Sequence, residues 1–247
     1  MGLIFSWFQK IFSLPDYKIV LLGIDNVGKS TLVYTLLEHI HNLENLKLDE
    51  DETKHNRIPI TMGFNCESVD YKNLHLVFYD IAGQAMTRQV WYHYMKDTDL
   101  FMYMIDLENK DRYVESINSL FAFIEDTDSE FPGLLLKIPI FIVLNKIDKY
   151  TKNDGELNFE KIHEQVDIFR KTLHDTNKEK YTQLISNRKI RFIITSALQG
   201  HFLKVLMTEI QRSLLGLGPG PSLKSFSNVD NNTNTSTTDN IKESAIV

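Results

Sequence analysis

The sequence has 247 residues, of which 43% are hydrophobic and 24% charged. This composition is typical of a folded globular chain and excludes collagen-like and wholly disordered proteins. The balance of 27 basic to 33 acidic residues gives a net charge of −6, so nucleic acid is not expected as a partner. Cys66 is the single cysteine, which excludes an intrachain disulfide framework, and no apolar run is long enough to span a membrane. We therefore expect a monomeric cytoplasmic protein with one folded domain.

Residues 1–15 are predicted to form an amphipathic helix. The start Met1-Gly2-Leu3-Ile4-Phe5-Ser6 fits the N-myristoylation pattern, in which Gly2 carries the fatty acid once Met1 is removed. One myristoyl chain binds membranes only marginally, so stable binding needs a second signal. An amphipathic helix that ends at Pro15 could supply it, although the same helix could instead pack on the core. Its apolar side chains recur at helical spacing: Leu3, Ile4, Trp7, Phe8, Ile11 and Phe12.

Strand and helix patterns alternate through the predicted domain, residues 16–216. The alternation predicts an α/β fold with a mostly parallel six-stranded sheet and helices on both faces. Two strands that follow each other closely, at 64–71 and 73–79, should provide the one antiparallel strand. The other strands are expected at 17–22, 100–105, 139–144 and 190–194, and helices at 30–41, 112–126, 159–173 and 202–214.

The first strand leads into Gly23-Ile24-Asp25-Asn26-Val27-Gly28-Lys29-Ser30, which fits the phosphate-loop pattern G-x-x-x-x-G-K-S/T. Its place between an apolar strand and a helix predicts a P-loop NTPase fold. The glycines let the loop wrap tightly, and backbone N–H groups at the helix N-terminus can bind phosphate. Lys29 would contact the β- and γ-phosphates, and the Ser30 hydroxyl would bind Mg²⁺.

A second phosphate-site motif, Asp80-Ile81-Ala82-Gly83-Gln84, follows the third predicted strand segment. Asp80 can hold Mg²⁺ through a water molecule. The Gly83 N–H can detect a γ-phosphate, and Gln84 can orient the attacking water. These roles predict nucleotide hydrolysis as well as binding.

The choice of base is indicated by Asn145-Lys146-Ile147-Asp148, directly after an apolar run. The Asp148 carboxylate can accept two N–H bonds from guanine, whereas adenine offers no such pair of donors on that edge. Thr195-Ser196-Ala197 follows the last strand and would bring backbone N–H groups near the guanine oxygen. The motif predicts GTP rather than ATP.

Together these motifs resemble a small GTPase of the Ras superfamily, and residues 2–213 are similar to the ADP-ribosylation factor (Arf) and Arf-like family. The narrower resemblance depends on Gly2 with its helix, Thr61-Met62-Gly63-Phe64-Asn65, Gly83-Gln84 and Trp91-Tyr92-His93-Tyr94. It implies GTP or GDP and Mg²⁺ as ligands, with the Mg²⁺ bound by Ser30 and Thr61. The implied catalytic residues are Gln84, Lys29 and Thr61. The implied nucleotide-binding residues are Gly23, Asp25, Asn26, Val27, Gly28, Lys29, Ser30, Thr31, Thr61, Asp80, Gly83, Asn145, Lys146, Asp148, Ser196 and Ala197.

The resemblance further implies a switch that hydrolyses GTP slowly and acts in vesicle-mediated or intracellular protein transport. Its partners would be an exchange factor, a GTPase-activating protein, effectors and a membrane surface. Phe64, Tyr79 and Tyr94 match the family's exposed effector-binding aromatics, although core packing is the alternative for them. GDP would leave the N-terminal helix docked on the domain, and GTP would release it to the Golgi or another endomembrane.

Several features depart from the family pattern and suggest a divergent Arf-like protein. Insertions lie near residues 42–56 and within 149–187, and Ile60 separates Pro59 from Thr61. Ala82 and Tyr79 replace the usual glycine and tryptophan, and the tail 217–247 is predicted to be disordered.

Two other functions stay open at this point. A one-residue slip caused by Ile60 could misplace Thr61 and leave a GTP-locked adaptor with negligible turnover. A P-loop kinase or ATPase is the third possibility, but it gives Asn145-Lys146-Ile147-Asp148 no role.

Overall fold

The structure is a computed structural model that describes residues 14–43, 61–152, 154–187 and 189–218. The predicted N-terminal helix up to residue 13, most of the first insertion with Ile60, and the predicted tail from residue 219 lie outside the described residues. Within the described ranges the strands form one six-stranded sheet with the order β2-β3-β1-β4-β5-β6. Only the β2–β3 pair is antiparallel, so the predicted fold class is confirmed. The strands are β1 Asp16–Leu22, β2 Phe64–Tyr71, β3 Leu74–Ile81, β4 Leu100–Asp106, β5 Pro139–Asn145 and β6 Lys189–Ile194.

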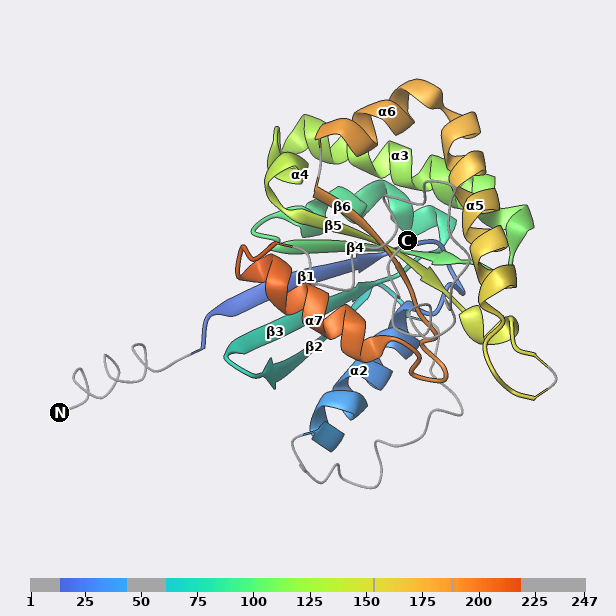
Figure 1. Cartoon of the computed structure of the whole chain (residues 1–247). Coiled ribbons are helices and arrows are strands. Elements are labelled where there is room, and N and C mark those ends of the chain that lie inside the picture. Colours follow the sequence, from blue (N-terminus) through green and yellow to red (C-terminus); the bar gives the residue numbers. More distant parts are fainter. Residues whose placement is uncertain (1–13, 44–60, 153, 188, 219–247) are drawn as a thin grey trace.

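Helices cover both faces of this sheet (Figure 1), with α2 and α7 on one face and α3, α5 and α6 on the other. The α-helices are α2 Lys29–Leu43, α3 Tyr113–Glu130, α4 Leu134–Lys137, α5 Phe159–Thr176, α6 Lys178–Asn187 and α7 Leu203–Leu214. The 3₁₀ segments are η2 Ala85–Met95, η3 Lys110–Arg112 and η4 Ile147–Lys149. No helix in these described ranges is long and apolar enough to cross a bilayer.

The two faces have separate hydrophobic cores because successive strand residues point to opposite sides. In β1, Ile19 and Leu21 pack with α2 and α7, whereas Val20 and Leu22 pack with α3 and α5. Both kinds of position are fully buried, which explains why this strand is a continuous apolar run.

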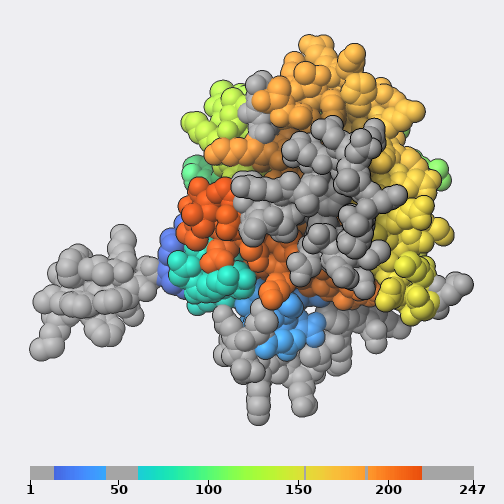
Figure 2. Space-filling view, viewed as in Figure 1, coloured from blue at the N-terminus to red at the C-terminus, as the bar shows by residue number. Residues whose placement is uncertain are grey.

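Two details differ from the sequence-based expectation. Strand β3 continues to Ile81, so Asp80 lies within the strand rather than after it. The second insertion includes a helix that was not predicted, α6, which continues from α5 and forms one surface with it (Figure 2). Its polar composition hides one buried apolar residue, Leu184, and Lys180 pairs with Glu125 of α3 at 2.6 Å.

Candidate nucleotide site

The phosphate loop joins β1 to α2, and two of its positions require glycine. Gly23 has a φ of +143°, and an added Cβ would lie 2.6 Å from the Met104 carbonyl oxygen. Gly28 has a φ of +95°, and its Cβ would lie 2.5 Å from Asn145 Nδ2. A side chain at either position would push the loop off the strands beneath it. Asn26 also takes a left-handed φ, +62°, at the tip of the loop.

Lys29 begins α2 and lies almost completely buried beneath the loop. Its Nζ donates to the carbonyl oxygens of Gly23 at 2.9 Å and Ile24 at 3.0 Å. Burial lowers the pKa of Lys29 to about 8, against the opposing charges of Asp80 and Asp25. A bound phosphate group would supply negative charge beside this buried ammonium and raise its pKa again.

Three oxygen-bearing side chains converge beside the loop from α2, the segment before β2, and β3. Ser30 Oγ donates to Asp80 Oδ2 and lies 2.9 Å from Thr61 Oγ1. Thr61 Oγ1 in turn lies 3.2 Å from Asp80 Oδ2. The structure therefore brings Thr61 to the predicted site, beside Ser30 and Asp80.

Asp80 has an electrostatic environment that suits a cation. It is only 2% exposed, and burial raises the pKa of its carboxyl group. Its Oδ1 has no hydrogen-bond partner in the described part of the chain. A buried carboxylate oxygen without a partner, next to two hydroxyl groups, is the hard oxygen donor set that Mg²⁺ prefers. Ser30, Thr61 and Asp80 thus fit the metal that sequence reasoning assigned to them.

The predicted base-binding residues meet at the ends of β5 and β6. Asn145 Nδ2 donates to the Val27 carbonyl oxygen at 2.8 Å, which ties the phosphate loop to β5. Asn145 Oδ1 accepts bonds from the Ala197 N–H at 2.9 Å and from Thr195 Oγ1 at 3.2 Å. Asn145 is therefore a structural link between the phosphate loop and the segment after β6.

Asp148 lies next to this link and is 9% exposed. Its Oδ1 accepts a 2.5 Å bond from Ser196 Oγ, which fixes the carboxylate while leaving its other lone pairs available. Lys146 takes a left-handed φ of +69°, and its Nζ pairs with Asp106 Oδ2 at 2.7 Å. Sequence reasoning missed Asp106, although its place at the end of an apolar strand is a usable signal.

The segment after β3 is called switch II here and comprises residues 82–95. Its first residues lie in close contact with the phosphate loop. A Cβ on Gly83 would lie 2.4 Å from the Gly23 oxygen and 2.6 Å from the Asp25 nitrogen, so only glycine fits. Gln84 follows with an exposed side chain. Trp91 is buried in the core and anchors the segment, because its Nε1 donates to the Ala82 oxygen at 2.9 Å.

An ion-pair cluster was missed entirely by sequence reasoning. Asp25 of the phosphate loop pairs with Arg112 at 2.8 Å and with Arg88 at 3.3 Å, and both arginines also pair with Glu115. A side-chain hydrogen bond from Arg112 is the largest cause that lowers the pKa of Asp25. The Asp25 side chain is thus committed to these arginines, and Asp25 would contact phosphate through its backbone N–H.

The three predicted effector-binding aromatics form one cluster on β2, β3 and η2. The Phe64 and Tyr79 rings are stacked with centroids 6.2 Å apart, and Phe64 and Tyr94 lie 5.6 Å apart. Phe64 is 51% exposed and the two tyrosines are half-buried, so the cluster is not ordinary core. Of the other predicted site residues, Thr31 lies in the first turn of α2, and Gly2 lies outside the described residues.

The fold, with a glycine-containing phosphate loop, a lysine beneath it and the nearly buried Asp148 carboxylate beside it, is that of the small GTPases. A family model described as "ADP-ribosylation factor family" matches residues 4–214, and the chain belongs to that family. Members bind GTP and GDP with Mg²⁺ and hydrolyse GTP, and this chain does the same. Like small GTPases in general, it works with regulators and effectors.

Individual relatives agree with this assignment. The chain is 28% identical over 214 residues to ADP-ribosylation factor-like protein 1 of Drosophila melanogaster, covering 87% of this chain and 98% of the relative. It is 33% identical over 138 residues to the protein of the same name in Caenorhabditis elegans, covering 56% and 68%. The solved structure of the Arl6 BBS3 small GTPase from Trypanosoma brucei, with bound GppNp, matches in fold. Its TM-score is 0.56 at 20% identity, covering 82% of this chain and 99% of that one.

Proposed function

We propose that this protein is a molecular switch that hydrolyses GTP slowly and binds a membrane and effectors in its GTP state. The observation that carries the proposal is the convergence of Thr61 with Ser30 and Asp80, together with Gly83 pressed on the phosphate loop. The segment before β2, which contains Thr61, and the segment after β3, which contains Gly83, then lie where a γ-phosphate and its metal would hold them. GTP and GDP differ by that group alone, so this closed arrangement responds to the nucleotide.

The roles of the residues in hydrolysis follow from their positions. Lys29 lies under the loop and would stabilise charge on the β- and γ-phosphates, while Ser30 and Thr61 would hold Mg²⁺, with Asp80 holding it through water. When bound, Mg²⁺ neutralises charge that develops on the phosphates. Gln84, exposed directly after Gly83, would orient the attacking water.

An arginine in trans completes this proposed site. Arg88 is the single arginine between residues 61 and 95, and its guanidinium already binds the Gly83 oxygen and Glu115. The Arg88 side chain is therefore already bound to groups of this protein. It does not act as an arginine finger, which would contact the γ-phosphate during hydrolysis. A GTPase-activating protein would supply that arginine, which accelerates hydrolysis by ~10³–10⁵-fold in GTPases.

Gln84→Leu separates the switch from the GTP-locked adaptor. We expect single-turnover GTP hydrolysis to fall by ~10–100-fold while GTP binding stays unchanged, because the exposed side chain orients water and supports no packing. Gln89→Leu, an exposed change five residues away, is the matched control. A wild-type rate near zero that Gln84→Leu leaves unaltered would favour the adaptor. The position of Thr61 beside Ser30 supports the switch.

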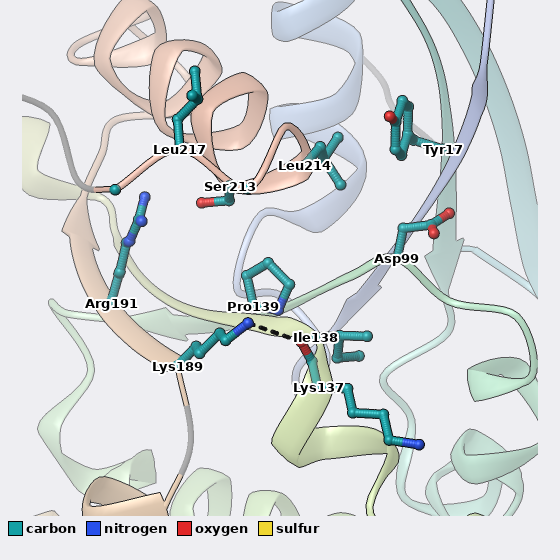
Figure 3. Close-up of a pocket in the computed structure, with 12 residues that line it drawn as sticks. Tyr17, Asp99, Lys137, Ile138, Pro139, Lys189, Arg191, Ser213, Leu214 and Leu217 are labelled. Atoms are coloured by element: carbon teal, nitrogen blue, oxygen red, sulfur yellow. Dashed lines mark hydrogen bonds between the residues drawn. The ribbon is translucent and has the colours of Figure 1, made fainter.

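Membrane binding would depend on residues 1–13 and on the surface of the domain near residue 14. A cavity of about 520 Å³ opens near the amino ends of β1 and β5, with Tyr17, Pro139 and Leu214 among its lining residues (Figure 3). Tyr17 lies four residues after residue 13, so the described part of the chain begins close to this cavity. We include this cavity in the surface that would hold the N-terminal segment in the GDP state.

Gly2→Ala tests the lipid anchor. The change removes the acceptor amine of the glycine, so we expect loss of N-myristoylation and a shift of the protein from the membrane fraction to the supernatant. The amphipathic segment alone is expected to retain only a minor share, because stable anchoring takes two signals. Fractionation with detection of the acyl group by mass spectrometry measures both effects. Undiminished membrane retention of the unacylated variant would rule out the anchor.

Reversible association with the Golgi or another endomembrane, a role in protein transport and a monomeric state complete the proposal. They are supported by the family to which the chain belongs. An exchange factor and effectors that contact the cluster of Phe64, Tyr79 and Tyr94 are its proposed partners. The exposed ring of Phe64 is the natural centre of that contact surface, since exposed aromatic side chains are frequent anchors of interfaces.

A further inference from the structure

The ion-pair cluster beside the phosphate loop joins three stretches that are far apart in the sequence: the loop, switch II, and the junction of η3 with α3. Its members are Asp25 in the loop, Arg88 in η2, Arg112 in η3 and Glu115 in α3. Arg88 Nη2 lies 2.7 Å from Glu115 Oε1, and Arg112 Nε lies 2.9 Å from Glu115 Oε2. Hydrogen bonds from Arg112, assisted by Arg88, lower the pKa of both Asp25 and Glu115, so both carboxylates stay charged.

The two arginines differ in what else they hold. Arg112 Nη1 donates to the Asp25 backbone oxygen at 3.0 Å, so it fixes the phosphate loop, and its side-chain partners within the described residues are Asp25 and Glu115. Arg88 belongs to switch II, and its Nε donates to the Gly83 oxygen at 2.9 Å. Its Nη1 donates to Ser119 Oγ at 3.1 Å, and its side chain is 15% exposed. Of these two arginines, Arg88 is the one that connects the start of switch II to both the loop and α3.

The Gly83 oxygen and the Gln84 nitrogen belong to one planar peptide group. A donor that fixes this oxygen also fixes the direction in which the peptide faces the loop. The backbone of Gly83 also lies against residues 23–25. This contact holds the position of Gly83, and the hydrogen bond from Arg88 holds the orientation of its peptide group. The guanidinium fork suits this task, because it donates along several directions in one plane, which an ammonium cannot do.

We propose that Arg88 is a positioning residue that holds the Gly83–Gln84 peptide in the closed switch, and so sets both the preference for GTP and the alignment of Gln84. The guanidinium does this through Asp25 on one side and through Glu115 and Ser119 on the other. The inference rests on the roles of Gly83 and Gln84 in the proposed function. It assigns Arg88 no contact with nucleotide.

Arg88→Lys tests the effect on nucleotide preference. Lysine keeps the charge but cannot reach all of these acceptors, so the dissociation rate of a fluorescent GppNHp analogue should rise ~10-fold, as for loss of a charge-assisted hydrogen bond. The dissociation rate of the matching GDP analogue should stay within about 2-fold, because GDP has no γ-phosphate for Gly83 to contact. Arg170→Lys, which changes a cation of α5 that lies over the Phe192 ring of β6, should leave both rates unchanged. An equal rise in both rates, with a lower melting temperature, would reduce Arg88 to a structural residue and overturn the inference.

Single-turnover hydrolysis in a double-mutant cycle tests the link to Gln84. Arg88→Lys should slow hydrolysis ~10-fold in the wild-type background and cause no further loss in the Gln84→Leu background, because both changes remove one function. Additive losses would contradict positioning through Gln84. If Gln84→Leu alone has no effect, the proposed catalytic role of Gln84 fails. If Gln84→Leu slows hydrolysis and Arg88→Lys does not, only the present inference fails.

Discussion

Asp148→Asn is expected to lower the affinity for GTP by ~10³-fold and to make XTP the preferred nucleotide. The Asp148 carboxylate is 9% exposed and held by Ser196, so it presents fixed acceptors to the two N–H donors of guanine. An asparagine would turn an NH₂ group toward these donors and leave buried groups unpaired, which costs about 2–5 kcal/mol. Xanthine carries an oxygen where guanine carries its amino group, and this oxygen accepts a bond from the asparagine.

Competition against a bound fluorescent guanine nucleotide by GTP, XTP and ATP measures this exchange directly. Asp154→Asn removes the same charge at an exposed position and should leave the order of preference unchanged. Retained GTP preference in Asp148→Asn would show that this carboxylate does not contact the base. Equal competition by ATP and GTP in the wild type would instead favour a P-loop kinase or ATPase.

Gly83→Ala is expected to weaken binding of a GTP analogue by ~10²-fold and to change GDP binding little. The new methyl group would lie 2.4 Å from the Gly23 oxygen and from the Ile24 carbonyl carbon, which are backbone atoms with no freedom to rotate away. The loop cannot retreat, because Gly23 itself lies against Met104. Switch II must therefore move away from the loop, and its contact with a γ-phosphate is lost; ~10²-fold corresponds to about 2.7 kcal/mol.

Titration of the variant with GppNHp and GDP gives the two affinities separately. Gly218→Ala is the matched control, since an added Cβ there meets open space and the backbone needs no left-handed φ. Its two affinities should equal those of the wild type. If Gly83→Ala binds GppNHp as tightly as the wild type, the close contact between switch II and the loop has no part in nucleotide recognition.

The sequence predicted the phosphate loop well because the constraint there is local. Gly23 and Gly28 are required by backbone geometry within a few residues, and the flanking strand and helix are apolar patterns that can be counted. The same holds for Asn145, which ends a buried strand, and for the alternation that predicts the sheet. Thr61 was assigned by resemblance alone, and the structure brings it to Ser30.

Other features could not be predicted because they depend on distant residues meeting. Asp25, Arg88 and Arg112 come from three different elements, and nothing in their spacing indicates that they form one cluster. Helix α6 was missed because its polar surface outweighs one buried leucine, Leu184, whose partners lie on other elements. The ion-pair cluster and helix α6 are both determined by tertiary contacts, and local secondary-structure propensity does not predict them.

The central claim is that GTP, and not GDP, places this protein on a membrane. Co-sedimentation of the myristoylated full chain with liposomes, after loading in parallel with GDP or GppNHp and verification of the bound nucleotide, tests it directly. We expect sedimentation with the GppNHp form and retention of the GDP form in the supernatant. Equal binding of both forms would contradict nucleotide-controlled release of the N-terminal segment and favour the GTP-locked adaptor.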